Sequence, residues 1–242
     1  MTITNIDESQ REATRIAGFT FVFAMVIVMF GNLYISANLI VPGNAVETAR
    51  NILEHETLFR INIACDLLYV ITVAVMLTAL YVILKPVSSG LAMTAAILRL
   101  VYGLVWIVIP LNMLGALTLL GDAPYLKVFE ADRLQVLAKV HLTGSFDAYY
   151  VGLPFWALAS TICGYLWFKS GYIPRMFAGL GVLASAWCVL CAFTFIVYPN
   201  FGKMVNLWWF DTPMALFEMA LGVWLMFKGL PISSIAEHES KL

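Results

Sequence analysis

The sequence predicts an all-α fold: a bundle of six transmembrane helices with both termini in the cytoplasm. Hydrophobic residues make up 62% of the 242 residues and charged residues 12%, whereas soluble domains are about half apolar and a quarter charged. The apolar runs continue over about twenty residues, long enough to cross about 30 Å of hydrocarbon as helices. They lack the period-two alternation of membrane β-strands. A multi-pass integral membrane protein is therefore expected.

Six apolar stretches are the predicted spans, and a polar segment lies at each end of the chain. The apolar run behind the N-terminal segment exceeds the core of a signal peptide, which favours an uncleaved first helix. The predicted organisation is a polar segment at 1–14, a transmembrane domain at 15–229 with spans at about 15–41, 60–84, 91–120, 137–168, 176–198 and 212–228, and a polar tail at 230–242.

Proline and glycine mark where several spans begin and end. Val41-Pro42-Gly43 stops the first span and Lys85-Pro86 stops the second, because proline cannot continue a helix and glycine favours its end. Asp211 is predicted to cap the sixth span, with Pro213 in its first turn.

The segments between spans indicate an orientation. Residues 43–60 place apolar side chains at three- and four-residue spacing among charges, which predicts a short interfacial helix. Trp208 and Trp209 suit the headgroup region. With both termini inside, seven Lys and Arg residues lie in the cytoplasm and six outside, and the inside links KPVSSG and KSGYIPR are short and free of acids. We therefore expect this orientation.

Ionisable and amide side chains within the apolar segments are the candidate functional residues, since charges in hydrocarbon are costly and rarely lack a role. They are Asp66, Arg99, His141, Asp147 and Glu218, with Asn62 and Asn112. At helical rise the three carboxylates lie about 9, 15 and 8 Å below the outer ends of their spans, whereas Arg99 lies about 12 Å from an inner end. This one-sided polarity favours a pocket that opens outward over a pore.

Each candidate also has a structural interpretation. Asp66 could form an ion pair with Arg99 or Arg60, because a buried carboxylate must pair or be protonated. Arg99 could instead extend to the cytoplasmic surface. His141 could be a hydrated interfacial histidine, or it could exchange protons with Asp147.

Helix faces add further expectations. Glu218 could be a protonated interhelical hydrogen-bond donor or one wall of the pocket, and Gly222, one turn later, would let a neighbouring helix or a ligand approach closely. Two polar faces could meet, as helical spacing gathers two sets of side chains: Asn62, Asp66 and Tyr69 on the second span, and Thr143, Asp147 and Tyr150 on the fourth.

The sequence contains no established catalytic or cofactor motif. Three histidines, one of them in the tail, do not supply a multi-histidine zinc site or a facing pair for haem. Phosphate-loop, dinucleotide and G-x-S-x-G motifs are absent. Ser145 shares a helix face with His141, but Asp147 is about 120° away from His141, which disfavours a Ser-His-Asp relay.

The cysteines and the net charge limit which cofactors and partners are expected. The four cysteines, including the spacing Cys188-Val-Leu-Cys191, are expected to pack as small apolar groups rather than to bind metal. No cofactor or metal is expected. A net charge of -1 without a basic tract disfavours nucleic acid as a partner.

Several motifs resemble those of one family. LFRINIACDLL at 58–68, ILRLVYG at 97–103, His141 with Asp147, GYLWFKSGYIPRMFAG at 164–179 and FEMALGVWLMFKG at 217–229 are similar to the bacterial membrane-protein family known as domain of unknown function 4386 (DUF4386). The GYL-x-x-x-SGYIPR stretch is the most specific. The resemblance covers about Arg15 to Gly229 and implies a six-helix bacterial membrane protein without an established activity. It adds Arg60, Gly171, Pro174 and Arg175 to the residues of interest.

The sequence thus favours a protein of the bacterial inner membrane whose outward pocket takes a small or lipid-like ligand. One alternative is a proton-coupled small-molecule transporter in which Asp66 and Asp147 titrate and Arg99 is the counter-charge. Another is a lipid-modifying enzyme with Asp147 and His141 as acid and base, although a binding role is favoured over catalysis. The expected partners are the bilayer and that ligand. The sequence does not predict an oligomeric state.

Overall fold

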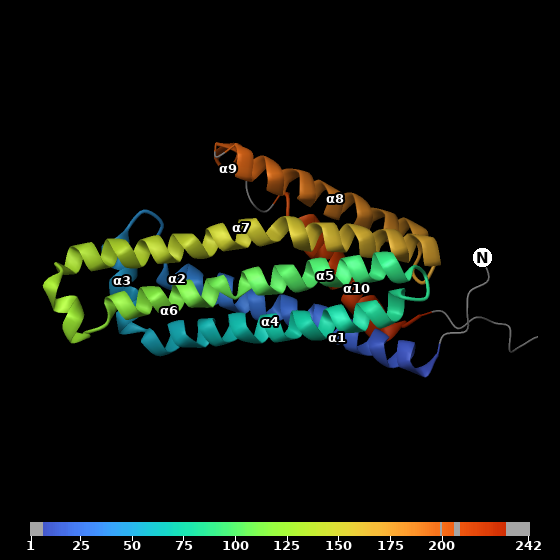
Figure 1. Cartoon of the computed structure of the whole chain (residues 1–242), viewed down its shortest axis with the longest axis horizontal. Coiled ribbons are helices and arrows are strands. Elements are labelled where there is room, and N and C mark those ends of the chain that lie inside the picture. The colour runs from blue at the N-terminus through green and yellow to red at the C-terminus, as the bar shows by residue number, and fades with distance from the viewer. Residues whose placement is uncertain (1–6, 199, 206–208, 231–242) are drawn as a thin grey trace, which may run out of the picture. The chain divides into compact units, whose positions relative to one another are not determined.

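The computed structural model describes residues 7–198, 200–205 and 209–230, and this part of the chain is helical without a β-strand (Figure 1). The all-α prediction is confirmed there. The elements are α1 (Glu8–Met29), the π-helix η1 (Phe30–Ser36), α2 (Ala37–Leu39), α3 (Ala45–Glu54), α4 (Glu56–Leu84), α5 (Ser89–Trp106), α6 (Val108–Leu120), the 3-10 helix η2 (Pro124–Val128), α7 (Ala131–Ser170), α8 (Arg175–Val197), α9 (Phe201–Met204) and α10 (Thr212–Phe227).

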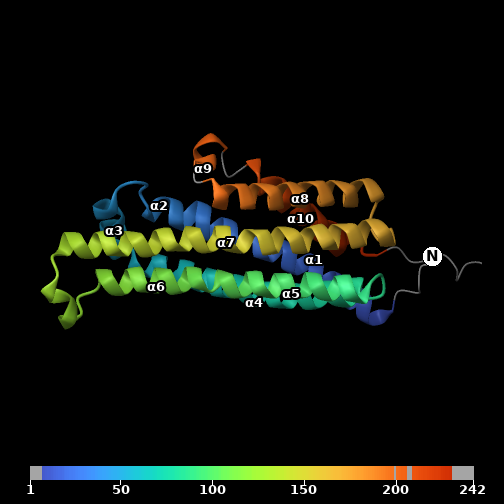
Figure 2. The ribbon, with the colours of Figure 1, turned by 45° about the horizontal axis from the view of Figure 1, so that its top comes forward.

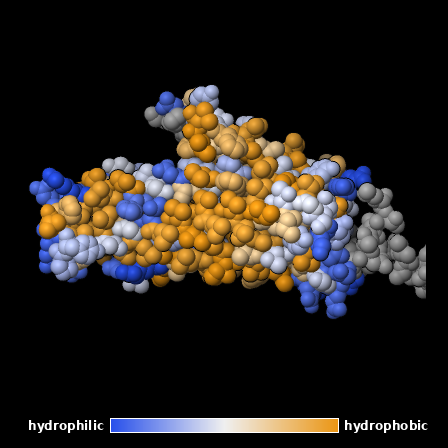
Figure 3. Space-filling model, in the orientation of Figure 1, coloured by the Kyte–Doolittle hydropathy of each residue, from blue (hydrophilic) through white to orange (hydrophobic). Residues whose placement is uncertain are grey.

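Five helical stretches are long and apolar enough to cross a membrane: Glu8–Leu39, Glu56–Leu84, Ser89–Leu120, Ala131–Ser170 and Arg175–Val197. α10 is apolar too, but its 16 residues extend about 24 Å at helical rise, short of about 30 Å of hydrocarbon. Apolar side chains cover large continuous areas of the visible face (Figure 3). These findings indicate a multi-pass membrane protein, while the count of six spans and the orientation remain predictions.

The chain divides into two compact units. The described residues within 7–23, 73–101 and 153–230 form one, which we call the α10 unit, and residues 24–72 and 102–152 form the other, which we call the α6 unit. Helices α1, α4, α5 and α7 contribute residues to both. In the α10 unit, α8 packs beside α10 (Figure 2). The core of the α6 unit is apolar and includes Ile35, Leu39, Ile52, Phe59, Met113 and Leu142.

Local hydrogen bonds explain where several helices begin and end. α1 begins at Glu8, inside the predicted polar segment, because Asp7 and Gln10 form a capping box. The Asp7 Oδ1 accepts from the Gln10 N–H at 2.7 Å, and Gln10 Oε1 accepts from the Asp7 N–H at 3.2 Å. α7 is followed by Gly171, whose φ of 70° is the left-handed conformation that commonly ends helices. Pro174 then precedes α8.

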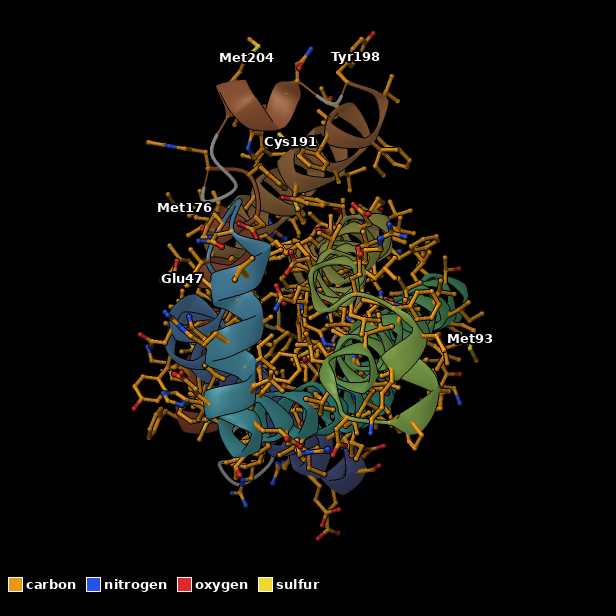
Figure 4. The ribbon with its side chains drawn as sticks, turned by 90° about the vertical axis from the view of Figure 1, so that its left-hand side faces the viewer. Glu47, Met93, Met176, Cys191, Tyr198 and Met204 are labelled. Atoms are coloured by element: carbon orange, nitrogen blue, oxygen red, sulfur yellow. The ribbon has the colours of Figure 1, made fainter. Side chains whose placement is uncertain are left out.

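The short helix predicted between the first two spans is α3. Its N-cap is Asn44, whose Oδ1 accepts from the Glu47 N–H at 3.0 Å. Ala49 and Ile52 are buried, whereas Glu47, labelled in Figure 4, is partly exposed.

The segment between α8 and α10 carries exposed side chains. Tyr198 and Met204 lie at the same edge of the α10 unit (Figure 4), and Trp209 is 73% exposed. Trp208 lies outside the described residues. Asp211 holds the N-cap position of α10 with Pro213 in the first turn, as predicted, although its side chain makes no capping hydrogen bond.

Two helices of the α6 unit are irregular. The continuation of α1 is the π-helix η1, a conformation frequent near functional sites. α5 and α6 are separated at Ile107. Pro110 explains this break, because it has no N–H to bond the carbonyl of Trp106 four residues earlier.

Candidate functional site

The α10 unit contains a buried ion pair. Arg99 Nη2 on α5 donates to Glu218 Oε1 on α10 at 2.7 Å, and the two side chains are 3% and 7% exposed. Such a pair removes two charges from an apolar surrounding, where either alone is costly.

Two residues of α7 complete the surroundings of the Glu218 carboxylate. Ser160 Oγ donates to Oε1 at 2.6 Å and accepts from Arg99 Nη2 at 3.0 Å. Trp156 Nε1 donates to Oε2 at 3.1 Å and to Oε1 at 3.3 Å. Glu218 therefore accepts hydrogen bonds from three side chains, which offset the cost of removing a carboxyl group from water.

The Arg99 guanidinium makes further contacts with α1 and α4. Its Cζ lies 5.6 Å from the centroid of the Phe21 ring, a cation–π distance. Its Nη1 lies 3.6 Å from Met76 Sδ. Side chains of α1, α4, α5, α7 and α10 thus meet at one ion pair, which fixes the mutual arrangement of these helices in the α10 unit.

Close glycine packing brings α1 and α10 together beside the ion pair. A Cβ added to Gly18 would lie 2.9 Å from the Gly222 carbonyl oxygen, and one added to Gly222 would lie 3.1 Å from the Gly18 oxygen. Larger residues would force the helices apart. The predicted close approach one turn after Glu218 is confirmed.

Two predicted roles of arginine are wrong. Asp66 is paired with neither Arg99 nor Arg60, since Arg99 binds Glu218 and Arg60 Nε binds Glu56 Oε1 at 2.7 Å. Arg99 does not extend to a surface, because it is 3% exposed. The ion pair also puts Arg99 and Glu218 at one level, although depths counted from helix ends predict opposite halves. The count fails because α10 has only 16 residues, so Glu218 lies about as far from the end of α10 at Phe227 as Arg99 lies from the start of α5 at Ser89.

In the α6 unit, Asp66 lies beside an aromatic cluster. Its Oδ1 accepts from Trp106 Nε1 at 3.0 Å, and the residue is partly exposed. Within the described ranges no lysine or arginine forms an ion pair with it. Among the described residues, no side chain donates a hydrogen bond to the second carboxylate oxygen of Asp66.

The aromatic cluster consists of Tyr69, Tyr102, Trp106 and Tyr149. The Trp106 ring centroid lies 4.5, 5.5 and 5.9 Å from those of Tyr69, Tyr102 and Tyr149. The hydroxyls of Tyr69 and Tyr102 are hydrogen-bonded to each other at 2.8 Å. Tilted and edge-to-face rings at these distances attract one another, so the cluster holds the Trp106 indole against Asp66.

All three residues of the predicted polar face of α4 contact other helices. Asn62, Asp66 and Tyr69 each make a side-chain hydrogen bond to another helix. Asn62 Nδ2 donates to Ser36 Oγ of η1 at 2.8 Å. Gly31 of η1 packs against the Asn62 amide, where a Cβ would collide with its oxygen. The π-helix thus lies directly beside this face.

Helices α6 and α7 are joined by a reciprocal arrangement. His141 Nδ1 lies 3.3 Å from Asn112 Oδ1. A Cβ on Gly115 would lie 2.8 Å from His141 Nδ1, and one on Gly144 would lie 3.1 Å from Asn112 Nδ2. Each polar side chain therefore occupies the space left by a glycine of the opposite helix.

Two of the three residues on the predicted polar face of α7 point away from the described helices, whereas the third, Tyr150, packs against Tyr149. Asp147 and Thr143 are exposed, and Thr143 Oγ1 donates to the Lys139 carbonyl of its own helix at 3.0 Å. His141 makes its hydrogen bond with Asn112 rather than with Asp147. The proposed proton exchange between His141 and Asp147 is not assembled in this arrangement.

A hollow of about 180 Å³ lies beside Arg99, too narrow for a water molecule. Its lining is mostly apolar and consists of Leu77, Leu80, Tyr81, Leu84, Ala92, Ala95, Ala96, Arg99 and Cys163. It includes neither Asp66 nor Asp147. The outward pocket therefore remains a prediction.

Three residues of these two sites were missed as site residues from the sequence: Trp106, Trp156 and Ser160. A signal for the tryptophans exists, since tryptophan favours membrane interfaces, and a tryptophan well inside an apolar segment needs a partner for its N–H. Ser160 gave no such signal, because a serine in a helix can bond its own backbone.

The apolar helices and the ion pair buried among them indicate a multi-pass membrane protein. The chain belongs to the family described as Domain of unknown function (DUF4386), whose sequence model matches residues 16–229. It is 24% identical over 166 residues to an uncharacterized protein from Archaeoglobus fulgidus, an alignment that covers 68% of this chain and 80% of that relative. No solved structure matches the chain. The expected family is thus confirmed.

Proposed function

We propose that this protein binds a small or lipid-like ligand within the membrane, at Asp66 in the α6 unit. The observation that carries the proposal is a partly exposed carboxylate on an apolar helix with a single side-chain hydrogen bond, from Trp106. A carboxylate in such a setting needs a proton or a ligand to offset its desolvation. The neighbouring Asn62, Asn112 and His141 would shape the surroundings, and exposed Asp147 would lie on the approach.

The ion pair Arg99–Glu218 has a different part in this proposal. Its charges already satisfy each other at 2.7 Å, so we assign it to holding the helices of the α10 unit. The transporter alternative, in which Arg99 is the counter-charge of titrating aspartates, loses support from this pairing. The enzyme alternative loses support from the separation of His141 and Asp147.

A photolabelling experiment tests the proposal. The protein is reconstituted in lipid nanodiscs and exposed to a dodecyl maltoside analogue with a diazirine in its alkyl chain. We expect the analogue to label peptides around Asp66 and Trp106. Excess unlabelled dodecyl maltoside should suppress this labelling. Labelling of α8, whose Leu183 and Leu190 are 70% and 65% exposed, serves as the measure of general lipid contact and should resist competition.

Two variants make the test specific to the site. Asp66→Ala should reduce the suppressible labelling severalfold, whereas Asp122→Ala, at an exposed position between α6 and η2, should leave it unchanged. Unfolding followed by circular dichroism verifies that both variants are folded. Equal labelling of α4 and α8 without competition would refute the proposal.

A further inference from the structure

We infer that the ligand of the Asp66 site carries a positively charged ammonium group. This inference rests on the proposed function and adds the chemical class of the ligand. It depends on three properties of the α6 unit: the sign of the free charge, the partners of the other charges, and the aromatic rings beside it.

The charge available at the site is negative. Four of the five lysine and arginine side chains of the α6 unit have partners other than Asp66, and the fifth, Lys127 of η2, forms no ion pair with Asp66. Arg50, Arg60 and Arg133 lie 3.8, 2.7 and 3.1 Å from glutamates of their own helices or helix ends, and Lys139 Nζ donates to the Val41 carbonyl at 3.4 Å. Asp66 is thus left for an external cation, and an anionic ligand would be repelled.

The geometry of the carboxylate favours the same class. Trp106 holds Oδ1 at 3.0 Å and so fixes the direction of the second oxygen. A carboxylate that one hydrogen bond already orients loses less conformational entropy when it binds a cation through its other oxygen. Asn62, one turn earlier on the same face, is already bonded to Ser36, so it does not compete for Asp66.

The rings of the cluster supply the second element of ammonium recognition. Tyrosine and tryptophan faces attract cations, and binding sites for alkylated ammonium groups combine such rings with a carboxylate. Tyr149 of the cluster is only partly buried, and its ring lies 5.4 Å from that of the next residue of α7, Tyr150. Rings and carboxylate together therefore fit an alkylammonium better than a bare metal ion, which would require several oxygen ligands.

Competition between matched ligands tests the charge. The photolabelling assay is repeated with dodecyltrimethylammonium and with dodecyldimethylamine N-oxide at pH 8, because the two differ mainly in the charge of the head group. The cationic compound should compete about tenfold better. Asp66→Asn should remove this preference, and Asp122→Asn should retain it. Sodium chloride at equal ionic strength controls for screening.

The outcomes separate this inference from the proposed function. Equal competition by both compounds would overturn the charge assignment while the ligand site stands, and labelling that no compound suppresses would refute the site itself. A preference that survives in Asp66→Asn would overturn the role of Asp66. If tetramethylammonium also competes, the ligand can be a free cation without an alkyl chain. If only the long-chain compound competes, the ligand is the head group of a molecule held in the membrane.

Discussion

Arg99 and Glu218 are 119 residues apart in the sequence, yet Nη2 and Oε1 are separated by 2.7 Å. Both side chains are buried, and the pair is the point at which side chains of α1, α4, α5, α7 and α10 meet. Losing one partner of this pair costs more stability than losing both. Removing either partner leaves the other as an uncompensated charge, whereas replacing both with apolar groups removes the problem.

Glu218→Ala should therefore lower the free energy of unfolding by about 3–5 kcal/mol, the range for breaking a buried ion pair. The double variant Arg99→Met with Glu218→Met should lose less than either single variant. Reversible unfolding in mixed micelles measures both. Additive losses in the double variant would contradict this account of the pair.

Trp156 donates its indole N–H to both oxygens of Glu218. Trp156→Phe should cost about 1.5–3 kcal/mol of stability, because a hydrogen bond to a charged group is lost. Trp209→Phe is the matched control, since that side chain is 73% exposed, and it should change stability by less than about 0.5 kcal/mol. Similar losses in the two variants would argue against the Trp156 contact.

Gly115 leaves the space that His141 occupies. Gly115→Ala should destabilise the protein by about 1–3 kcal/mol through overpacking. Gly179→Ala, in a helix position with nothing within 4 Å, should instead stabilise it by about 0.5–1 kcal/mol. Thermal unfolding followed by circular dichroism distinguishes the two, and a stabilising Gly115→Ala would show that α6 and α7 do not pack this way.

Gly171 has a φ of 70° at the end of α7. Gly171→Ala should cost about 1–2 kcal/mol, because a Cβ disfavours this backbone conformation. Gly171→Asn should recover part of the loss, since asparagine tolerates the left-handed region. Denaturation midpoints of the three proteins provide the comparison, and an unaffected Gly171→Ala would contradict the turn geometry.

The sequence was sufficient for features that depend on neighbouring residues. Apolar run length predicts the long helices, and Pro213 correctly marks the first turn of α10. Helical spacing also gathers Asn62, Asp66 and Tyr69 on one face, which the structure confirms. These features are local, so the identity of a few adjacent side chains decides them.

Features that depend on helix rotation and partner choice could not be predicted. Arg99 has acids on several predicted spans as possible partners, and the sequence does not specify which helix lies beside α5. Asp147 belongs to a face that the same spacing rule predicts, but Asp147 and Thr143 on that face are exposed. A helical pattern specifies which residues share a side and leaves open what that side faces.

The ion pair has a consequence for how the chain is made. Ribosomes synthesise proteins from the N-terminus, so Arg99 enters the membrane long before Glu218 exists. An arginine at the centre of an inserting helix costs about 2.5–3.5 kcal/mol, and in the nascent chain that cost is not yet offset by its carboxylate. Among the described helices α10 is last in the chain. A product truncated before Thr212 would retain an unneutralised arginine, which would distinguish it from the finished protein during quality control.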